Sequence, residues 1–253
     1  MNGVRTSLPV LTFHSVDDQS SVISFSPRLF RDGLAKLRDH GYHTIDLMEA
    51  VGMVKRGETF PDRSFVITFD DGYRNAYSEA FPVLQQSGMS ATVFVTVGEA
   101  WTSGSTRLPS QSGRDMLSWD EIREMHASGS IRFGAHTLTH PDLTTLPADR
   151  VEAEVRDSKS IIEDALSAPV ASFAYPFGRY DERSREIASR HFECACSDRL
   201  GLITAKSDAF ALERVDAYYL RTDRLFDILF TNSFSRYIWA RSVPRRIKRA
   251  LTG

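Results

Sequence analysis

Short apolar runs alternate with amphipathic helical patterns along the chain. Several of the runs are apolar throughout, which is typical of strands that are buried on both faces of a parallel sheet. The expected strands are 10–14, 44–47, 65–69, 92–97, 131–135, 172–175, 193–197 and 210–215.

Between these runs, apolar residues recur at helical spacing, and the ends carry start and stop signals. Ser26 followed by Pro27 predicts a helix start, Ser118 with Glu121 predicts a capping box, and Gly88 predicts a helix end. The expected helices are 26–41, 72–86, 118–129 and 149–166, and a shorter one begins near 181.

The order of strand and helix therefore repeats seven or eight times, which favours a parallel sheet. We predict an α/β protein whose sheet closes into a distorted barrel of seven or eight β/α units. An open, doubly wound sheet is the alternative.

Composition and charge exclude several classes of protein. The chain has 253 residues, 42% of them hydrophobic and 25% charged, which is ordinary for a globular protein. A disordered, collagen-like or membrane-spanning chain is thereby excluded. The formal net charge of −2 gives no reason to expect a nucleic-acid partner. Cys194 and Cys196 cannot form a disulfide framework and are expected to be buried free thiols.

The N-terminus lacks the long apolar stretch and the cleavage site of a signal peptide. We therefore expect a cytoplasmic protein.

Two adjacent carboxylates, Asp70 and Asp71, follow the strand expected at 65–69. Functional residues of parallel α/β folds collect at the carboxyl ends of strands, and a bound cation would offset the repulsion between the two charges. Adjacent residues of an extended chain point to opposite sides, so one carboxylate is free to bind metal while the other acts as a base. The alternative is that both residues simply cap the following helix.

Two histidines, His136 and His140, follow the strand expected at 131–135. Histidines four residues apart on one helical turn face the same side and are able to chelate one ion. Together with Asp71 they predict a three-ligand site with open positions, which is the form of a catalytic zinc site. A pair of surface histidines on a loop is the alternative.

These two motifs together resemble the NodB-like polysaccharide deacetylases, or carbohydrate esterase family four. Residues 68–72 read TFDDG and residues 136–140 read HTLTH, and the resemblance extends over residues 8–216. The resemblance implies the NodB-homology barrel and an enzyme that removes acetyl groups, usually N-acetyl, from sugars.

By the same resemblance, Asp70 is the general base, and Asp71, His136 and His140 bind one divalent metal ion. Zn²⁺ is the expected ion, and this ligand set also accepts Co²⁺ or Ni²⁺. The backbone N–H of Phe177 is implied as a donor to the oxyanion, a role that an acyl-transfer transition state needs.

The chain departs from the family pattern in two places. The third motif usually carries an arginine that braces the base, but residues 174–178 read AYPFG, with Ala174 in its place. The fifth motif usually supplies a catalytic histidine, but residues 212–214 read LER. We take Arg214 as a candidate replacement for the missing brace.

The N-terminal segment around His14 resembles a branch of the family that looks circularly permuted and takes its catalytic acid from the first strand. His14 is therefore the candidate acid, and a structural histidine at a strand end is the alternative. In the implied mechanism, Asp70 takes a proton from metal-activated water and His14 protonates the leaving amine.

The substrate is expected to be a polysaccharide, oligosaccharide or lipid-linked sugar of the N-acetylglucosamine type. Tyr73, Trp119, Tyr175 and Pro176 are candidates for contact with a sugar ring, and ordinary core packing is the alternative for each. The activity alternatives are an O-deacetylase, a deformylase of a lipid-linked sugar, and a non-catalytic sugar-binding scaffold.

The sequence predicts a catalytic domain at 1–220 and a C-terminal tail at 221–253, helical or partly disordered. After Asp227 the chain carries six Lys and Arg residues, interleaved with aromatic residues, and no acid. A stretch of this composition is suited to an anionic membrane surface. We therefore consider peripheral contact with the inner membrane surface. A C-terminal helix that simply packs on the barrel is the alternative.

Overall fold

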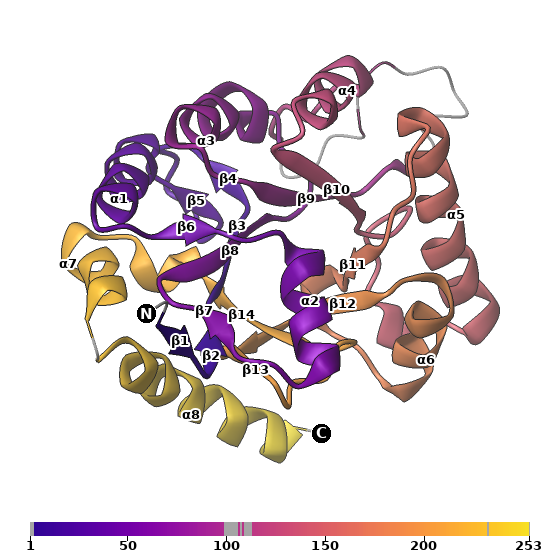
Figure 1. Ribbon diagram of the computed structural model, residues 1–253. Coiled ribbons are helices and arrows are strands. Elements are labelled where there is room, and N and C mark those ends of the chain that lie inside the picture. Colours follow the sequence, from indigo (N-terminus) through magenta and orange to yellow (C-terminus); the bar gives the residue numbers. More distant parts are fainter. Residues whose placement is uncertain (1–2, 99–105, 107, 109–112, 232, 253) are drawn as a thin grey trace.

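A closed barrel of seven parallel strands forms the centre of the protein, as the sequence predicts (Figure 1). The computed structural model describes residues 3–98, 106, 108, 113–231 and 233–252, and of residues 246–252 only the backbone. The barrel strands are β3 (Val10–Phe13), β8 (Ser64–Phe69), β9 (Ala91–Val95), β10 (Ile131–Ala135), β11 (Ser172–Ala174), β12 (Cys194–Leu200) and β14 (Leu212–Asp216).

The strands stand around the barrel in chain order, and the first strand closes the ring. β3 pairs in parallel with β8 on one side and with β14 on the other, in a register that sets Leu11 opposite both Ile67 and Val215. Every carboxyl end therefore meets at one mouth of the barrel, where the first strand lies between the second and the last.

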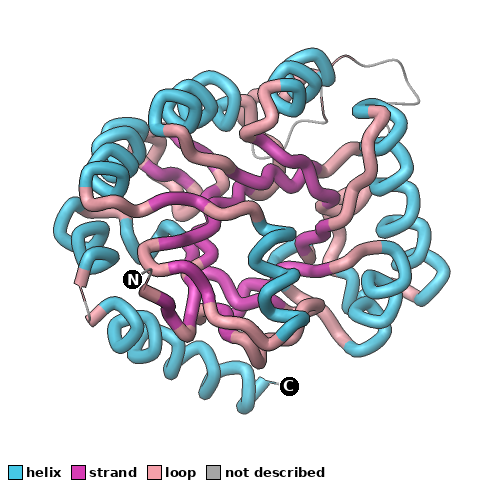
Figure 2. Tube along the Cα trace, in the orientation of Figure 1, coloured by secondary structure: helices cyan, strands magenta, loops and turns pink. Residues whose placement is uncertain are grey.

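Helices surround the strands on the outside (Figure 2). The helices between barrel strands are α1 (Pro27–Asp39), α2 (Leu47–Arg56), the π-helical turn η1 (Ala76–Ala80) with α3 (Phe81–Ser87), α4 (Trp119–Ala127), α5 (Ala148–Leu166) and α6 (Glu182–His191). Short helical turns are η3 (Leu143–Thr145), η4 (Pro176–Gly178), η5 (Ala217–Leu220), α7 (Asp223–Phe226) and η6 (Asp227–Phe230), and α8 (Phe234–Thr252) ends the chain.

Several predicted helix ends carry the expected local chemistry. Ser118 and Glu121 form the reciprocal capping box at the start of α4. Gly88 ends α3 in the left-handed conformation, at a φ of 63°. Ser26 precedes Pro27 at the start of α1, but its side chain makes no cap hydrogen bond.

The second expected strand is shorter than predicted. Only His43–Thr44 forms a strand, β6, which pairs with the start of β8 outside the closed ring. Asp46 accepts a hydrogen bond from the Met48 N–H and so caps α2, a helix that begins at Leu47. The sequence reading missed this helix because its first apolar residue extended the preceding apolar run.

Three short strand pairings lie outside the barrel sheet. β1 (Val4–Arg5) pairs antiparallel with β7 (Phe60–Pro61), and β2 (Ser7–Leu8) pairs antiparallel with β13 (Ile203–Thr204). β4 (Ser15–Val16) pairs in parallel with β5 (Ser24–Phe25).

The C-terminal segment packs on the barrel through its apolar residues. Phe226, Leu229, Phe234 and Ile238 belong to the same buried cluster as the barrel strands. In the described part of the chain, no helix has both the length and the apolar character needed to cross a membrane. Cys194 and Cys196 are buried free thiols, as expected.

Candidate active site

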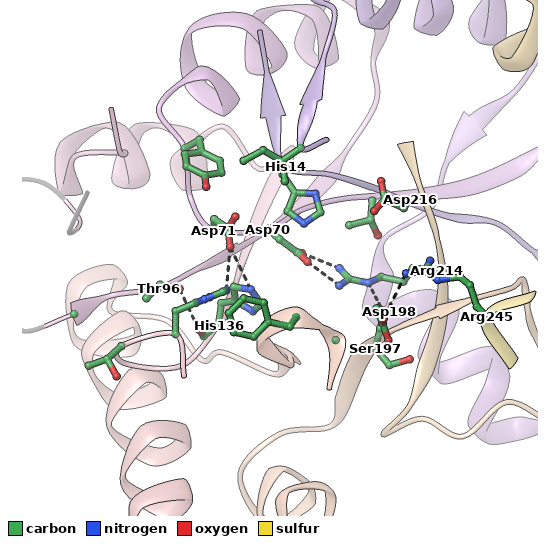
Figure 3. Close-up of a pocket in the computed structure, with 18 residues that line it drawn as sticks. His14, Asp70, Asp71, Thr96, His136, Ser197, Asp198, Arg214, Asp216 and Arg245 are labelled. Carbon is green, nitrogen blue, oxygen red and sulfur yellow. Dashed lines mark hydrogen bonds and ion pairs between the residues drawn. The ribbon is translucent and has the colours of Figure 1, made fainter. Parts of the chain in front are cut away.

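A cavity of about 890 Å³ opens at the carboxyl ends of the barrel strands (Figure 3). Side chains from all seven strand ends line it, because parallel strands meet at one edge. They include His14 after β3, Asp70 and Asp71 after β8, Thr96 after β9, His136 and His140 after β10, Phe177 after β11, Asp198 in β12, and Arg214 and Asp216 in β14, and α8 adds Arg245.

Asp71, His136 and His140 converge on one point in this cavity. The Nε2 atoms of His136 and His140 lie 3.4 and 3.3 Å from Asp71 Oδ1, and the three donor atoms lie within 4.8 Å of one another. Burial alone would raise the pKa of Asp71, but hydrogen bonds with the two imidazoles hold that pKa well below its ordinary value. Two imidazole nitrogens and an ionised carboxylate form a donor set that fits a divalent metal ion such as Zn²⁺.

The tautomer of His136 is decided by its second nitrogen. His136 Nδ1 donates to the Ala174 carbonyl oxygen at 2.7 Å, and a carbonyl only accepts. In the neutral ring the proton therefore belongs on Nδ1, and Nε2, the nitrogen that faces Asp71, is the one that would bind a metal ion. Metal-binding histidines are usually oriented by a hydrogen bond of this kind.

The His136–His140 segment is not the helical turn that its spacing predicted. Thr137 and His140 have φ values of 69° and 60°, so the chain bends sharply between the two imidazoles. The Thr137 hydroxyl accepts the His140 N–H at 3.0 Å. The two histidines thus meet through a turn with left-handed residues, which residue spacing alone did not reveal.

Glu154, which the sequence analysis missed, stabilises this turn by accepting hydrogen bonds from it. It is buried in α5, and its carboxylate accepts the N–H groups of Leu138 and Thr139 at 2.9 and 2.8 Å and the Thr139 hydroxyl at 2.7 Å. A signal was present in the sequence. Glu154 falls on the apolar stripe of α5, beside Val151 and Val155, where an acid needs partners.

Backbone strain concentrates at the cavity. Asp71 and Phe177 also have positive φ values, of 72° and 56°. Non-glycine residues in this region are uncommon and cluster at functional sites. The left-handed conformation of Asp71 also corrects the expectation that Asp70 and Asp71 point to opposite sides, since both line the same cavity.

Asp70 forms a buried, two-pronged ion pair with Arg214 from β14. The Nη1 and Nη2 atoms of Arg214 each donate to a different Asp70 oxygen at 2.7 Å (Figure 3). Arg214 Nε also donates to the Ser197 carbonyl oxygen at 3.0 Å. Burial alone would raise the pKa of Asp70, but the Arg214 charge and hydrogen bonds lower it below its ordinary value. The carboxylate is therefore held ionised.

His14 lies on the cavity wall at the end of β3, and its imidazole points toward Asp70 (Figure 3). The segment after it is held by Asn75, whose side chain accepts the Val16 N–H at 3.0 Å and donates to the Ser15 hydroxyl at 2.5 Å. His14 is thus carried on a fixed strand end next to the one that carries the two carboxylates.

Phe177 forms part of the wall beside His140. Its ring is 57% exposed and meets the His140 imidazole edge-on, with ring centroids 4.7 Å apart. Among the described residues, none accepts a hydrogen bond from the Phe177 N–H. The hydrogen-bonding capacity of that N–H is therefore available to a ligand.

Only one of the four predicted sugar-contact residues lines the cavity. Tyr73 is part of its wall, whereas Trp119, Tyr175 and Pro176 are buried in the protein and absent from that wall. Tyr175 donates its hydroxyl to the Phe210 carbonyl oxygen at 3.0 Å. The prediction of sugar stacking is therefore wrong for these three residues, because their rings pack in the core.

Asp198, Asp216 and Arg245 line the cavity and were not predicted. The first two are charged residues of strand ends, a position that the sequence already pointed to. Arg245 had no such signal, because it lies in the C-terminal tail, about three turns from the start of α8.

A comparison with known proteins agrees with the chemistry of this cavity. The family profile for polysaccharide deacetylase matches residues 57–191. The chain is 30% identical over 212 residues to the poly-beta-1,6-N-acetyl-D-glucosamine N-deacetylase of Staphylococcus aureus strain MRSA252, which covers 80% of this chain and 71% of that protein.

Two solved structures share the fold, and the description of the first calls it a deacetylase. The deacetylase PplD of Streptococcus pyogenes, in complex with acetate, superposes with a TM-score of 0.74 at 26% identity, over 83% of this chain and 92% of that chain. IcaB from Ammonifex degensii superposes with a TM-score of 0.73 at 26% identity, over 89% of this chain and 96% of that chain.

Proposed function

Because the chain belongs to the polysaccharide deacetylase family, we propose that it hydrolyses the acetamide of N-acetylglucosamine units and releases acetate. One observation carries this proposal. The three side chains that could hold a metal ion line the same cavity as Asp70, whose carboxylate is paired with Arg214. Asp70 and Asp71 are adjacent residues at one strand end.

Asp71, His136 and His140 would hold the metal ion in this proposal. A divalent ion bound there supplies a Lewis acid for the amide carbonyl and lowers the pKa of bound water. We propose Zn²⁺, with Co²⁺ or Ni²⁺ as substitutes, because imidazole and carboxylate ligands suit all three.

Asp70 is proposed as the general base. Arg214 keeps it ionised, so Asp70 is ready to take a proton from the attacking water at neutral pH. The paired guanidinium also restricts the carboxylate to one orientation. A base of this kind contributes about 10²–10⁴ in rate.

His14 and the Phe177 N–H are proposed to serve the leaving group and the oxyanion. An amine leaves poorly unless it is protonated, and His14 points toward Asp70 from the adjacent strand end. Phe177 lines the cavity with its ring against His140, and its N–H would be the donor that stabilises the negative oxygen of the tetrahedral intermediate.

The substrate is proposed to be a polymer or oligomer of N-acetylglucosamine. The Staphylococcus aureus relative is named for a β-1,6-linked polymer of this sugar, which supports the assignment. O-deacetylation and deformylation would use the same groups on a different acyl bond. The complete set of ionisable groups argues against a non-catalytic scaffold.

A lipid-linked sugar is the second candidate substrate. Trp239 of α8 is 63% exposed, and Arg241 is exposed two residues later. An aromatic and basic surface of this kind suits peripheral contact with an anionic membrane, as expected for a cytoplasmic enzyme acting at the inner leaflet. Co-sedimentation with vesicles of anionic and of neutral lipids tests this contact, and equal binding to both would contradict it.

Acetate release from N-acetylglucosamine oligomers by zinc-loaded protein tests the proposed function. We expect release that stops with a chelator and falls by about 10²–10⁴ in Asp70→Asn and in His14→Asn. His43→Asn is the matched control, because His43 is exposed in β6, away from the cavity.

Two results would contradict this proposal. Zinc-loaded wild-type protein that releases no acetate would contradict the N-deacetylase, and release of formate from an N-formyl sugar would then favour a deformylase. Acetate release that Asp70→Asn leaves unchanged would contradict the base.

A further inference from the structure

One end of the cavity contains a second group of charged side chains. Asp198, Asp216 and Arg245 line the same cavity as the proposed metal ligands. Figure 3 shows Asp198 and Asp216 on either side of Arg214, and Arg245 on the side of Arg214 away from His136. None of them contacts Asp71, His136 or His140 in any hydrogen bond or ion pair of the described residues. The proposed chemistry does not use this group.

Arg245 reaches the cavity because it lies on the packing face of α8. Phe234, Ile238 and Ser242 are buried at spacings of four residues, and Arg245 follows three residues later on the same helical face. The cation therefore faces the barrel, whereas Arg236 of the same helix is exposed.

Two contacts position the Arg245 guanidinium but use only part of its hydrogen-bonding capacity. Nη2 lies 3.6 Å from Asp198 Oδ2, and Nη1 donates to the Tyr219 hydroxyl at 3.4 Å. The two charged side chains are 42% and 30% exposed. An ion pair this long and this exposed is weak, so the remaining N–H groups of Arg245 are available to a ligand.

The mixture of charges selects the ligand chemistry. The two carboxylates of Asp198 and Asp216 would repel a phosphate, and Arg245 would repel an ammonium group. A sugar hydroxyl donates one hydrogen bond and accepts others, so it is able to donate to a carboxylate and accept from the guanidinium at once. Asp216 uses Oδ1 to accept the Tyr218 N–H at 2.8 Å, which leaves Oδ2 for a ligand.

We propose that Asp198, Asp216 and Arg245 bind the hydroxyl groups of a sugar residue next to the one that is deacetylated. The inference rests on the proposed function and deepens it, because it makes an oligosaccharide, not a single sugar, the preferred substrate. The cavity, at about 890 Å³, lies in the upper part of the range for ligand pockets. The C-terminal helix thereby completes the substrate site.

Arg245→Ala, compared with Arg236→Ala, tests this inference. Acetate release is measured on N-acetylglucosamine and on its tetramer. We expect wild-type kcat/KM to be higher for the tetramer, and Arg245→Ala to lower the tetramer value at least tenfold, mainly through KM. The value for the single sugar should stay unchanged, because a single sugar bound at Asp70 does not reach Arg245. Arg236→Ala should behave as wild type.

Asp198→Asn is the second variant and keeps the shape of the side chain. We expect the same selective loss for the tetramer, and partial rescue in Arg245→Lys, which retains the charge. Equal losses for both substrates in Arg245→Ala, or a wild type with no preference for the tetramer, would overturn the inference.

Binding separates this inference from the proposed function. The same two sugars are titrated calorimetrically into Asp70→Asn, with and without Arg245→Ala. Tighter binding of the tetramer that disappears with Arg245→Ala supports the inference even where wild-type protein releases no acetate, a result that contradicts only the proposed function. The same titration is made with Asp70→Asn/Arg236→Ala. If that variant loses tetramer binding as much as the Arg245→Ala variant does, the inference is contradicted and a general effect of the basic helix is favoured.

Discussion

Arg214 is fully inside the barrel, and its principal partner is the carboxylate of Asp70. Burial alone would lower the pKa of Arg214, but the charge of Asp70 raises it above its ordinary value. Each charge is tolerated in the interior because the other is present. The third-motif arginine missing at Ala174 thus has a counterpart in space, 144 residues along the chain from Asp70. Its role as the brace of the base is our proposal.

We expect Arg214→Met to lower the free energy of unfolding by about 3–5 kcal/mol, because it leaves the Asp70 charge buried and unpaired. Chemical denaturation of the variant measures this loss. The double variant Arg214→Met/Asp70→Asn should recover part of the stability, since neither charge remains, and should stay inactive. A double variant no more stable than Arg214→Met would contradict the pairing as the source of the loss.

Among the elements, α5 and the turn after β10 depend on one another. Glu154 of α5 accepts three hydrogen bonds from the segment between His136 and His140, and no other carboxylate of the described residues contacts these donors. Groups that orient metal ligands in this way typically influence metal affinity by 10–100-fold. The helix therefore positions the proposed metal ligands through one buried side chain.

Glu154→Gln should weaken zinc binding by about 10–100-fold. The amide keeps one oxygen, but its NH₂ group faces donors that need an acceptor. Competition with a chromogenic chelator measures the affinity. Asp164→Asn is the control, because Asp164 is exposed on the same helix. Equal zinc affinities in the two variants would rule out the positioning role.

At the scale of the whole molecule, closure of the barrel assembles the site. β3 lies between β8 and β14, so His14, Asp70 and Arg214 come from three adjacent strands. The proposed metal ligands come from the ends of β8 and β10, with β9 between them. A ligand that bridges these ends binds the folded state and stabilises the whole domain.

Zinc at a hundred times its Kd should therefore stabilise the wild type by about 2.7 kcal/mol. For a chain of this size that corresponds to a rise in Tm of roughly 5–10 °C. Asp71→Asn should show no such rise, whereas Asp164→Asn should respond as the wild type does. Scanning calorimetry with and without zinc measures it, and an equal rise in Asp71→Asn would show that zinc binds elsewhere.

The barrel was predictable because its signals are local. Apolar runs marked seven of the eight expected strands at nearly the correct residues, and only the segment that contains Leu47 was misassigned. The helix that begins inside this apolar run is marked by its cap, Asp46, and by buried residues at helical spacing from Leu47 to Val54. The candidate metal ligands could be singled out for the same reason, since residues 68–72 and 136–140 are each contiguous.

Other features were decided by the tertiary structure alone. The sequence offered Arg214 only as a candidate brace, through the family resemblance. Its contact with Asp70 and the entry of Arg245 into the cavity exist only once the barrel closes. Trp119 and Tyr175 have the residue types of a sugar site, yet the packing of their elements buries their rings. By itself, the sequence determined which side chains stand at the strand ends, because alternation and capping act over a few residues. The tertiary structure decided which of those side chains share a cavity, because that depends on which strands become neighbours.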